Sequence, residues 1–314
     1  MTLRVTFLGT AGAVPTTGRN PSGVFLNREG DCLLFDAGEG VQRQMMRFGT
    51  GFSISDIFLT HLHGDHVYGL PGLLETLDFN DREAPLTIHA PRHARKDVTA
   101  LLTACGGSPS FPVHVTEVDP GETAIESEDY EVRAFATDHR TTSVGYTLIE
   151  DDRKGRFDRE RAEELGIPVG PKFSQLHEGE PVELEDGTVV EPDQVVGPPR
   201  PGRRMVYTGD TRPADATVDA AADADLLIHD ATFGSAYADR ARETGHATAR
   251  EAAKVASAAG AARLILTHVS SRYAGDASVL AREASEAFDG ETRVAHDGLE
   301  IEVPYHSRST PKHE

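Results

Sequence analysis

The chain has 314 residues and only two cysteines, Cys32 and Cys105, and no segment approaches the roughly eighteen apolar residues that a membrane span needs. These features predict one large α/β domain or two ordinary ones, and they exclude a membrane span and a disulfide framework. Both thiols are expected to be buried and unreactive in a reducing cytoplasm. The strand-like start of the chain predicts no signal peptide.

The composition is strongly acidic, with a formal net charge of −20, and Lys supplies only five of the 31 basic residues. In dilute salt such a surface repels nucleic acid. At molar salt the Debye length falls to about 3 Å, so net charge then says little about distant partners. The abundance of Asp, Glu and Ala, with no Trp, favours a halophilic organism. The charge therefore does not exclude a polyanionic substrate.

Strands and helices are expected to alternate along most of the chain. Strands are predicted at residues 3–8, 24–26, 32–35, 57–59, 86–90, 113–118, 130–136, 143–149, 205–208, 226–230 and 264–268, with a last strand or two in 293–303. Helices are predicted from residues 41, 67 and 248. The glycine turn at residues 9–13 predicts a close-packed loop near a site, because its spacing differs from that of phosphate-binding turns.

Asp36 ends the second strand of a predicted hairpin. Its carboxylate suits two roles equally well. It can cap the helix predicted from Val41, or it can hold a metal-bound histidine from behind. Both alternatives stay open, and both roles can hold together.

The segment from Asp151 to Arg204 interrupts the alternation of strands and helices. Basic side chains are concentrated at residues 152–161, and Gly and Pro punctuate residues 165–171 and 197–202. Most segments of this kind are surface insertions. The basic residues favour a protruding arm that contacts a phosphate backbone.

A dense group of metal-ligand residues directly follows the apolar strand predicted at residues 57–59. His61 and His63 are two apart on an extended segment, so their side chains point the same way. Gly64 allows a turn that carries Asp65 and His66 to a second point close by. Two pairs of ligands aimed at two adjacent points predict a two-metal site.

Three further candidate ligands follow strands far along the chain, namely His139, Asp210 and His268. Asp210 is the natural bridge, since a carboxylate can span two ions and an imidazole cannot. His61, His63 and His139 are then expected on one ion, and Asp65, His66 and His268 on the other. Such donors suit zinc, with manganese and iron as alternatives. Two ions in such a site polarise a phosphoryl group, and Asp65 is placed to take a proton.

Other histidines are interpreted as structural. His89 and His114 stand alone in strands, and His229 lies in an apolar strand beside Asp230. His246 precedes a helix in which Thr248 and Glu251 have capping-box spacing. The residues alone give His246 no chemical role.

The cluster and its distant partners resemble the metallo-β-lactamase superfamily, and within it the short form of the tRNase Z family. The resemblance covers nearly all of residues 1–306. It is carried by the cluster with Gly69-Leu70-Pro71-Gly72 and by seven further stretches, which are Phe7-Leu8-Gly9-Thr10, Pro15 with Arg19-Asn20 and Ser22, Phe35-Asp36-Ala37-Gly38-Glu39-Gly40, Gly209-Asp210-Thr211-Arg212, Ala231-Thr232-Phe233, Gly245-His246-Ala247-Thr248 and Thr267-His268 with Ser270-Ser271-Arg272-Tyr273. One departure stands out. The family often has a Lys between its Pro and its Arg-Asn pair, whereas Thr16, Thr17 and Gly18 stand there here, so a substrate contact is expected to be weakened or missing.

The resemblance implies an α/β fold, the αββα four-layer sandwich, with one domain over residues 1–306, an inserted arm at 151–204 and a disordered tail at 307–314. It also implies two zinc ions per subunit on the seven ligands, Asp65 as general base, and His246 as the group that assists departure of a 3′-oxygen. The arm, with Gly170 and Pro171 near its tip, would grip precursor tRNA, and in a homodimer the arm of one subunit would serve the other.

The leading hypothesis is therefore a zinc-dependent endoribonuclease that removes the 3′ trailer from precursor tRNA and leaves a 3′-hydroxyl. The alternative is a phosphodiesterase or arylsulfatase of the same superfamily that acts on small-molecule esters. A small-molecule enzyme has no use for a basic arm. A non-catalytic metal-binding or RNA-binding protein is a third hypothesis, but binding alone needs neither a bridging Asp nor a base.

Overall fold

The computed structural model describes residues 2–104 and 109–305, and the chain falls into two compact units. The main unit comprises residues up to Ile149 and residues from Arg203 onward, and the inserted unit is Glu150–Gly202. Cys105 and the predicted tail from residue 307 lie outside the described residues. In the described part of the chain, no helix has the length and apolar character needed to cross a membrane.

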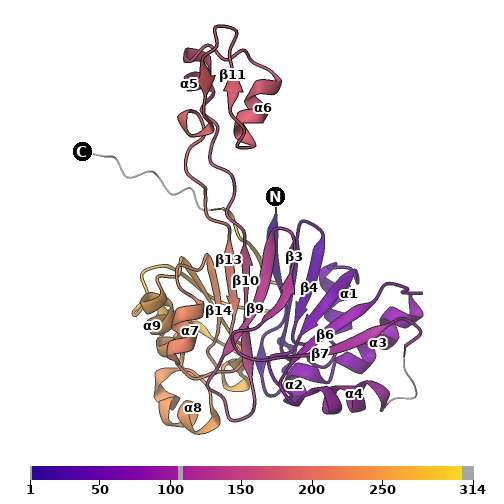
Figure 1. Cartoon of the computed structure of the whole chain (residues 1–314). Coiled ribbons are helices and arrows are strands. Elements are labelled where there is room, and N and C mark those ends of the chain that lie inside the picture. Colours follow the sequence, from indigo (N-terminus) through magenta and orange to yellow (C-terminus); the bar gives the residue numbers. More distant parts are fainter. Residues whose placement is uncertain (1, 105–108, 306–314) are drawn as a thin grey trace. The chain divides into compact units, whose positions relative to one another are not determined.

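Two seven-stranded sheets form the centre of the main unit (Figure 1). The order in the first sheet is β18 (Glu300–Glu302), β1 (Leu3–Gly9), β3 (Gly23–Arg28), β4 (Asp31–Phe35), β5 (Ile54–Phe58), β6 (Leu86–Pro91) and β7 (Val113–Val118). The order in the second sheet is β17 (Glu291–Val294), β15 (Arg263–Thr267), β14 (Leu226–Asp230), β13 (Arg204–Tyr207), β10 (Val144–Glu150), β9 (Tyr130–Ala136) and β8 (Thr123–Glu126).

Each sheet contains a block of parallel strands, β4 to β7 in the first sheet and β13, β14, β15 and β17 in the second. Parallel strands are buried on both faces, which explains why they read as continuous apolar runs. Every residue of β14, for example, is buried. The carboxyl ends of the parallel strands meet at one edge of each sheet.

The sheets pack face to face around aromatic rings, and helices cover their outer faces (Figure 1). Phe35 stacks on Phe58 with ring centroids 4.9 Å apart, and Tyr146 and Tyr207 pack against this pair from the second sheet. The covering helices are α1 (Val41–Phe48), α3 (Leu70–Phe79) and α4 (Arg95–Thr103) on the first sheet, and α7 (Asp215–Ala220), α9 (Ala249–Ala259) and α10 (Ser278–Ser285) on the second. This arrangement is the four-layer helix–sheet–sheet–helix sandwich expected from the sequence.

The inserted unit has a small core of its own, although the sequence shows little sustained periodicity there. It contains α5 (Arg159–Glu164), α6 (Pro171–His177), the hairpin of β11 (Val182–Glu183) and β12 (Val189–Val190), and the 3-10 turn η1 (Pro192–Gln194). Gly170 caps the start of α6. Six buried apolar residues pack together in this unit, namely Ala162, Ile167, Leu176, Val182, Val190 and Val195. Elements of two to seven residues are too short to carry a recognisable period.

Several elements differ from the sequence predictions. Helices α4, α7 and α10 were not predicted, because they bury few large apolar side chains; α4 buries only Val98. The last strands, β17 and β18, belong to different sheets. The capping box of Thr248 and Glu251 at the start of α9 is confirmed.

Candidate metal centre

The loop after β5 delivers four side chains to the carboxyl edge of the first sheet. His61 and His63 lie on its extended part, with His61 Nε2 2.9 Å from His63 Nδ1. The short helix α2 (Gly64–Val67) then carries Asp65 and His66. Tyr68 packs so closely on Gly64 that a Cβ at that glycine would lie 2.2 Å from the ring. A side chain at position 64 would therefore require the Tyr68 ring to move.

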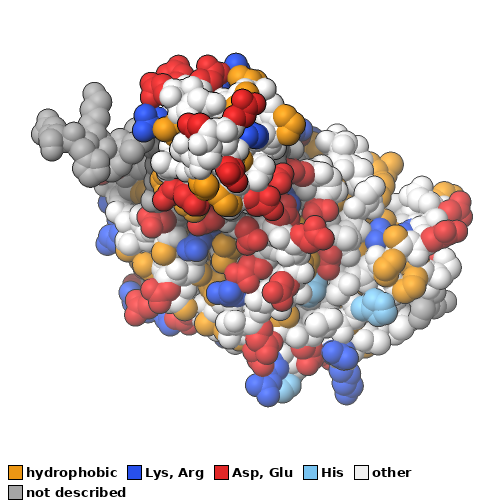
Figure 2. Space-filling view, turned by 45° about the horizontal axis from the view of Figure 1, so that its top comes forward, with side chains coloured by type: hydrophobic (Ala, Val, Ile, Leu, Met, Phe, Trp, Pro, Cys, Tyr) orange, Lys and Arg blue, Asp and Glu red, His pale blue; other side chains and the backbone are white. Residues whose placement is uncertain are grey.

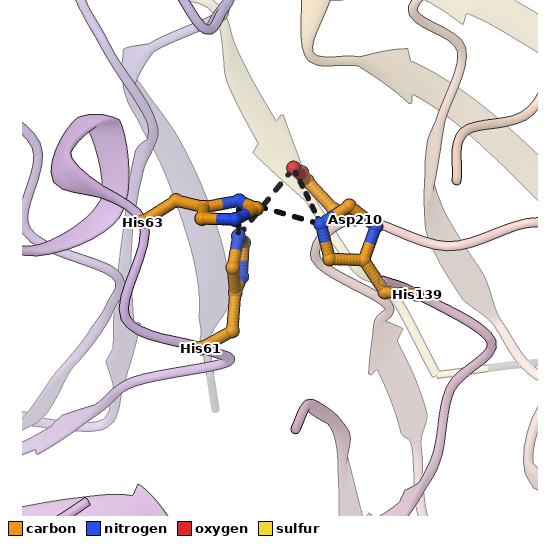
Figure 3. A group of neighbouring side chains, drawn as sticks. All are labelled: His61, His63, His139 and Asp210. Atoms are coloured by element: carbon orange, nitrogen blue, oxygen red, sulfur yellow. Dashed lines mark hydrogen bonds and ion pairs between the residues drawn. The ribbon is translucent and has the colours of Figure 1, made fainter. Parts of the chain in front are cut away.

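The first group of candidate ligands combines this loop with residues after β9 and β13 (Figure 3). His139 Nε2 lies 3.3 Å from His63 Nδ1. Asp210 Oδ2 lies 3.6 Å from His61 Nε2 and 3.9 Å from His139 Nε2. All four ligand atoms lie within 4.8 Å of one another.

The second group lies on the other side of Asp210. Its Oδ1 atom is 3.3 Å from His66 Nε2 and 3.2 Å from His268 Nε2. Asp65 Oδ2 is 3.4 Å from the same His66 atom and 3.2 Å from the same His268 atom. The two oxygens of Asp210 thus face separate groups, which is the arrangement that a bridging carboxylate requires. The structure brings together all seven residues that the sequence proposed as ligands.

The donor atoms of these groups fit divalent metal ions. His66 Nε2 and Asp210 Oδ1 are buried 3.3 Å apart, yet neither makes a hydrogen bond within the described residues. Such buried polar atoms cost free energy unless something else coordinates them. Imidazole nitrogens with carboxylate oxygens are a donor set for zinc, manganese and iron.

Burial and neighbouring charges determine the protonation of the candidate ligands. Burial lowers the pKa of His61 and of His63, which favours the neutral imidazole that binds metal. Burial also works against ionisation of Asp210, but the surrounding histidines lower its pKa well below the usual value. Burial lowers the pKa of His66, but Asp210 and Asp36 outweigh this and raise it.

Asp36 orients His66 of the second group by binding the ring nitrogen that faces away from the other candidate ligands. Its carboxylate accepts hydrogen bonds from His66 Nδ1 at 2.7 Å, the Tyr207 hydroxyl at 2.8 Å and the Thr60 backbone N–H at 2.8 Å. With Nδ1 donating, His66 turns Nε2 toward the ligand group. Asp36 has a left-handed backbone with φ 56°, a strained conformation that the surrounding contacts must maintain.

The two alternatives for Asp36 are therefore decided. The cap position of α1 is Gly40, and no side chain caps that helix. The capping role is wrong, and the role behind a histidine agrees with the contacts.

Two further imidazoles, those of His139 and His268, are also oriented by hydrogen bonds of their second nitrogen. His139 Nδ1 donates to the Gly245 carbonyl at 2.7 Å. His268 Nδ1 lies 2.8 Å from the Thr232 hydroxyl, which donates to Asp230 at 2.7 Å. Such partners fix both the ring and its tautomer.

The glycine turn at residues 9–13 closes the second group from above Asp65. The Ala13 backbone N–H donates to Asp65 Oδ2 at 2.9 Å. Strand β2 (Ala11–Gly12) pairs with β16 (Val269–Ser270), directly after His268. A Cβ on Gly12 would lie 2.8 Å from the His268 ring nitrogen. The turn is thus a close-packed loop at the site, as expected.

The neighbouring residues that the resemblance singled out serve as anchors of this turn. Arg19 donates to the Thr10 hydroxyl and to the Ala295 carbonyl, and the Asn20 N–H donates to Asp297. The Thr16 hydroxyl accepts from the Arg19 N–H at 3.0 Å. Thr16, which stands in the segment where the family often has Lys, therefore closes the turn on itself.

His246 and Asp230 form a pair at the edge of the site. His246 follows α8 (Ala238–Thr244), and its Nδ1 donates to Asp230 Oδ2 at 2.8 Å. Its ring centroid lies 5.0 Å from that of His268 and 5.3 Å from that of His139. Burial lowers the pKa of His246, but the Asp230 carboxylate outweighs this and raises it to about 9.

Asp230 was missed in the sequence analysis, where it counted only as a neighbour of His229. The available signal was its place at the end of β14, which parallels that of Asp210 after the adjacent β13. His89 is bound to Asp56 at 2.8 Å, and His114 is exposed on β7. His229 is buried, and its Nδ1 lies 2.7 Å from the Asp230 carbonyl oxygen, whereas its Nε2 has no hydrogen-bond partner in the described chain.

We expect Asp36→Asn to weaken metal binding about 10- to 100-fold, because His66 loses its charged partner. Metal content after dialysis, followed by calorimetric titration with zinc, measures the change. The matched control is Asp56→Asn, which alters another aspartate–histidine pair, of 2.8 Å, outside the ligand groups. Equal metal affinity in both variants would contradict a supporting role for Asp36.

Comparison with known proteins places the chain among close relatives. The family model of the metallo-beta-lactamase superfamily matches residues 16–268. Ribonuclease Z of Halobacterium salinarum is 67% identical over 305 residues, which cover 97% of this chain and 99% of that protein. Ribonuclease Z of Natronomonas pharaonis is 65% identical with the same coverage. The crystal structure of human tRNase Z, short form, superposes with a TM-score of 0.70 at 30% identity, covering 96% of this chain and 99% of that one.

Proposed function

Because the chain belongs to the ribonuclease Z family of the metallo-β-lactamase superfamily, we propose that it removes the 3′ trailer from precursor tRNA. It hydrolyses a phosphodiester near the discriminator base and leaves a 3′-hydroxyl. The observation that carries this proposal is identity of 65–67% over 97% of the chain with proteins named Ribonuclease Z. Both come from halophilic archaea, in agreement with the acidic composition.

The metal ions of this metal-dependent hydrolase are two zinc ions. His61, His63 and His139 would hold one ion, Asp65, His66 and His268 would hold the other, and Asp210 would offer one oxygen to each. The two oxygens of Asp210, which face separate groups, support this assignment. When bound, zinc would supply Lewis-acid polarisation of a phosphate and would lower the pKa of a coordinated water.

Asp65 and His246 move the protons. Burial raises the pKa of Asp65, but the neighbouring imidazoles of His268 and His66 outweigh this and lower it, so the carboxylate is ionised. It therefore accepts the proton of the attacking water. His246, held protonated by Asp230 up to a pKa of about 9, donates a proton to the departing 3′-oxygen.

The inserted unit is the element that grips the tRNA body, but it does so without a net positive charge. It contains seven Lys or Arg residues and fourteen Asp or Glu residues. Its basic segment is partly neutralised, since Arg159 pairs with Glu163 at 2.7 Å and Arg161 with Glu164 at 3.0 Å. Acidic side chains also dominate the face of the molecule in Figure 2. The basic arm expected from residues 152–161 is therefore an acidic unit with a local basic segment. Its contacts with phosphate must act at short range, in salt that screens the remaining charge.

A homodimer stays part of this proposal. In it, the inserted unit of one subunit holds tRNA bound at the other.

Purified protein should cleave a 3′-extended precursor tRNA, and EDTA should abolish the cleavage. The assay is run at low and at molar KCl, with 3′-end mapping of the product. Asp65→Ala should lower the rate by about 100-fold or more, since general base catalysis alone contributes that much. Absence of chelator-sensitive cleavage at every salt concentration would contradict the proposed function.

Asp230→Asn should shift the alkaline limit of activity to lower pH. In the native protein, protonated His246 is lost as pH rises through about 9. Without the Asp230 carboxylate, the lowering effect of burial is no longer offset by this charge, so the pKa of His246 falls and kcat declines from a lower pH. A kcat–pH profile measures the shift, with Asp56→Asn as the control. An unchanged alkaline limb would rule out His246 as the acid.

Deletion of residues 156–196 tests the inserted unit. Its ends lie close together, since Arg153 and Arg200 exchange backbone hydrogen bonds of 2.7 and 2.8 Å. We expect kcat/KM for precursor tRNA to fall by at least about tenfold, the equivalent of 1.4 kcal/mol of lost binding. By contrast, kcat/KM for bis-p-nitrophenyl phosphate should stay unchanged, because that ester is too small to reach the inserted unit. The ratio of the two kcat/KM values should therefore fall by the same factor. Full retention of precursor-tRNA cleavage would exclude the gripping role.

A further inference from the structure

Beside His246 lies a cluster of two aromatic rings and one guanidinium that the proposed mechanism does not use. Phe233 follows β14, Tyr237 ends the 3-10 turn η2 (Ser235–Tyr237), and Arg272 lies in the 3-10 turn η3 (Ser271–Tyr273). The guanidinium carbon of Arg272 is 5.7 Å from the centre of the Phe233 ring and 5.5 Å from that of Tyr237. The Phe233 ring centroid is 6.2 Å from that of His246.

The backbone fixes this cluster relative to His246. The Phe233 carbonyl accepts from the Ala249 N–H at 2.8 Å, which ties the loop after β14 to the start of α9. The Gly234 N–H donates to the Tyr273 hydroxyl at 2.8 Å. Glu283 then accepts from the N–H and the hydroxyl of Ser235 at 2.7 and 2.8 Å. These contacts tie the backbone of the loop after β14 to the segment that follows His246.

The exposed parts of the cluster have the chemistry of a nucleotide-binding site. Phe233 is buried, but 43% of Tyr237 is exposed. Arg272 is exposed and contacts the Ser270 hydroxyl at 3.3 Å, and it pairs with no carboxylate among residues 2–104 and 109–305. In a chain of net charge −20, a guanidinium without an acidic partner next to a reacting group is suited to a phosphate. Exposed aromatic rings stack on bases of any sequence.

We propose that Tyr237 and Arg272 bind the nucleotide whose 3′-oxygen departs beside His246. The Tyr237 ring stacks on its base, and the Arg272 guanidinium contacts the phosphate on its 5′ side. Since His246 donates a proton to that oxygen, the attached ribose and base must lie next to the cluster. Stacking tolerates any base, so one site can serve precursors that differ at this position. This inference rests on the proposed function.

A cycle of protein and substrate changes tests the stacking contact. The substrates are a 3′-extended precursor tRNA and the same RNA with an abasic residue on the 5′ side of the mapped cleavage site. We expect loss of the base to lower kcat/KM of the native protein about tenfold. Tyr237→Leu should cause a similar loss on the intact substrate and little further loss on the abasic one, whereas Tyr237→Phe should stay near the native value.

The same design tests Arg272 with a methylphosphonate in place of the 5′ phosphate. Arg272→Met and the uncharged linkage should each lower kcat/KM, and together they should cost no more than either alone. The matched controls are Phe79→Leu, which changes a ring that is 89% exposed on α3, and Arg95→Met on α4. Neither control should respond to the substrate change.

Losses that multiply, or a native protein that is indifferent to the abasic residue, would overturn this inference while the proposed function stands. Failure of the native protein to cleave precursor tRNA at all would instead reject the proposed function and this inference with it.

Discussion

The buried carboxylate of Asp36 is the contact on which both the sandwich and the metal centre depend. Asp36 directly follows β4 in the first sheet. Its carboxylate accepts a hydrogen bond from Tyr207, which lies on β13 of the second sheet. The same carboxylate orients His66 and fixes the start of the ligand loop at Thr60. A fully buried charge is tolerated only when its acceptor sites are filled. The contact between the two sheets and the orientation of the candidate ligand His66 therefore depend on the same carboxylate.

A buried aspartate with several hydrogen-bond donors around it also occurs in the second sheet, where Asp230 ends β14. Its carboxylate accepts from His246, from the Thr211 N–H and from the Thr232 hydroxyl that contacts His268. One buried aspartate thus links the proposed acid to a proposed ligand. Each sheet thus contributes a carboxylate at the end of a parallel strand, and the contacts of this carboxylate orient histidines of the site. The geometry of the site is set by strand ends, which are among the most rigid parts of such a fold.

The charge of the inserted unit differs from what its basic segment at residues 152–161 suggests. The site collects imidazoles and carboxylates in a largely buried setting, whereas the inserted unit carries twice as many acidic as basic residues. Long-range attraction for a polyanion is then weak, and recognition must come from short contacts such as guanidinium–phosphate pairs and stacking. Arg272 and Tyr237 offer contacts of this type within the main unit.

The sequence by itself determined the elements and the ligands with strong local patterns. The apolar runs marked the parallel strands, and the spacing of His61, His63, Asp65 and His66 marked the centre, since ligands on one loop are ordered by backbone geometry alone. The histidine partners of Asp36 and Asp230 were decided only by the tertiary structure. Asp36 had two equal roles and Asp230 had none assigned, because both partners lie in contacts made across strands and sheets. The short elements of the inserted unit were equally invisible, since their core forms from six residues spread over its length.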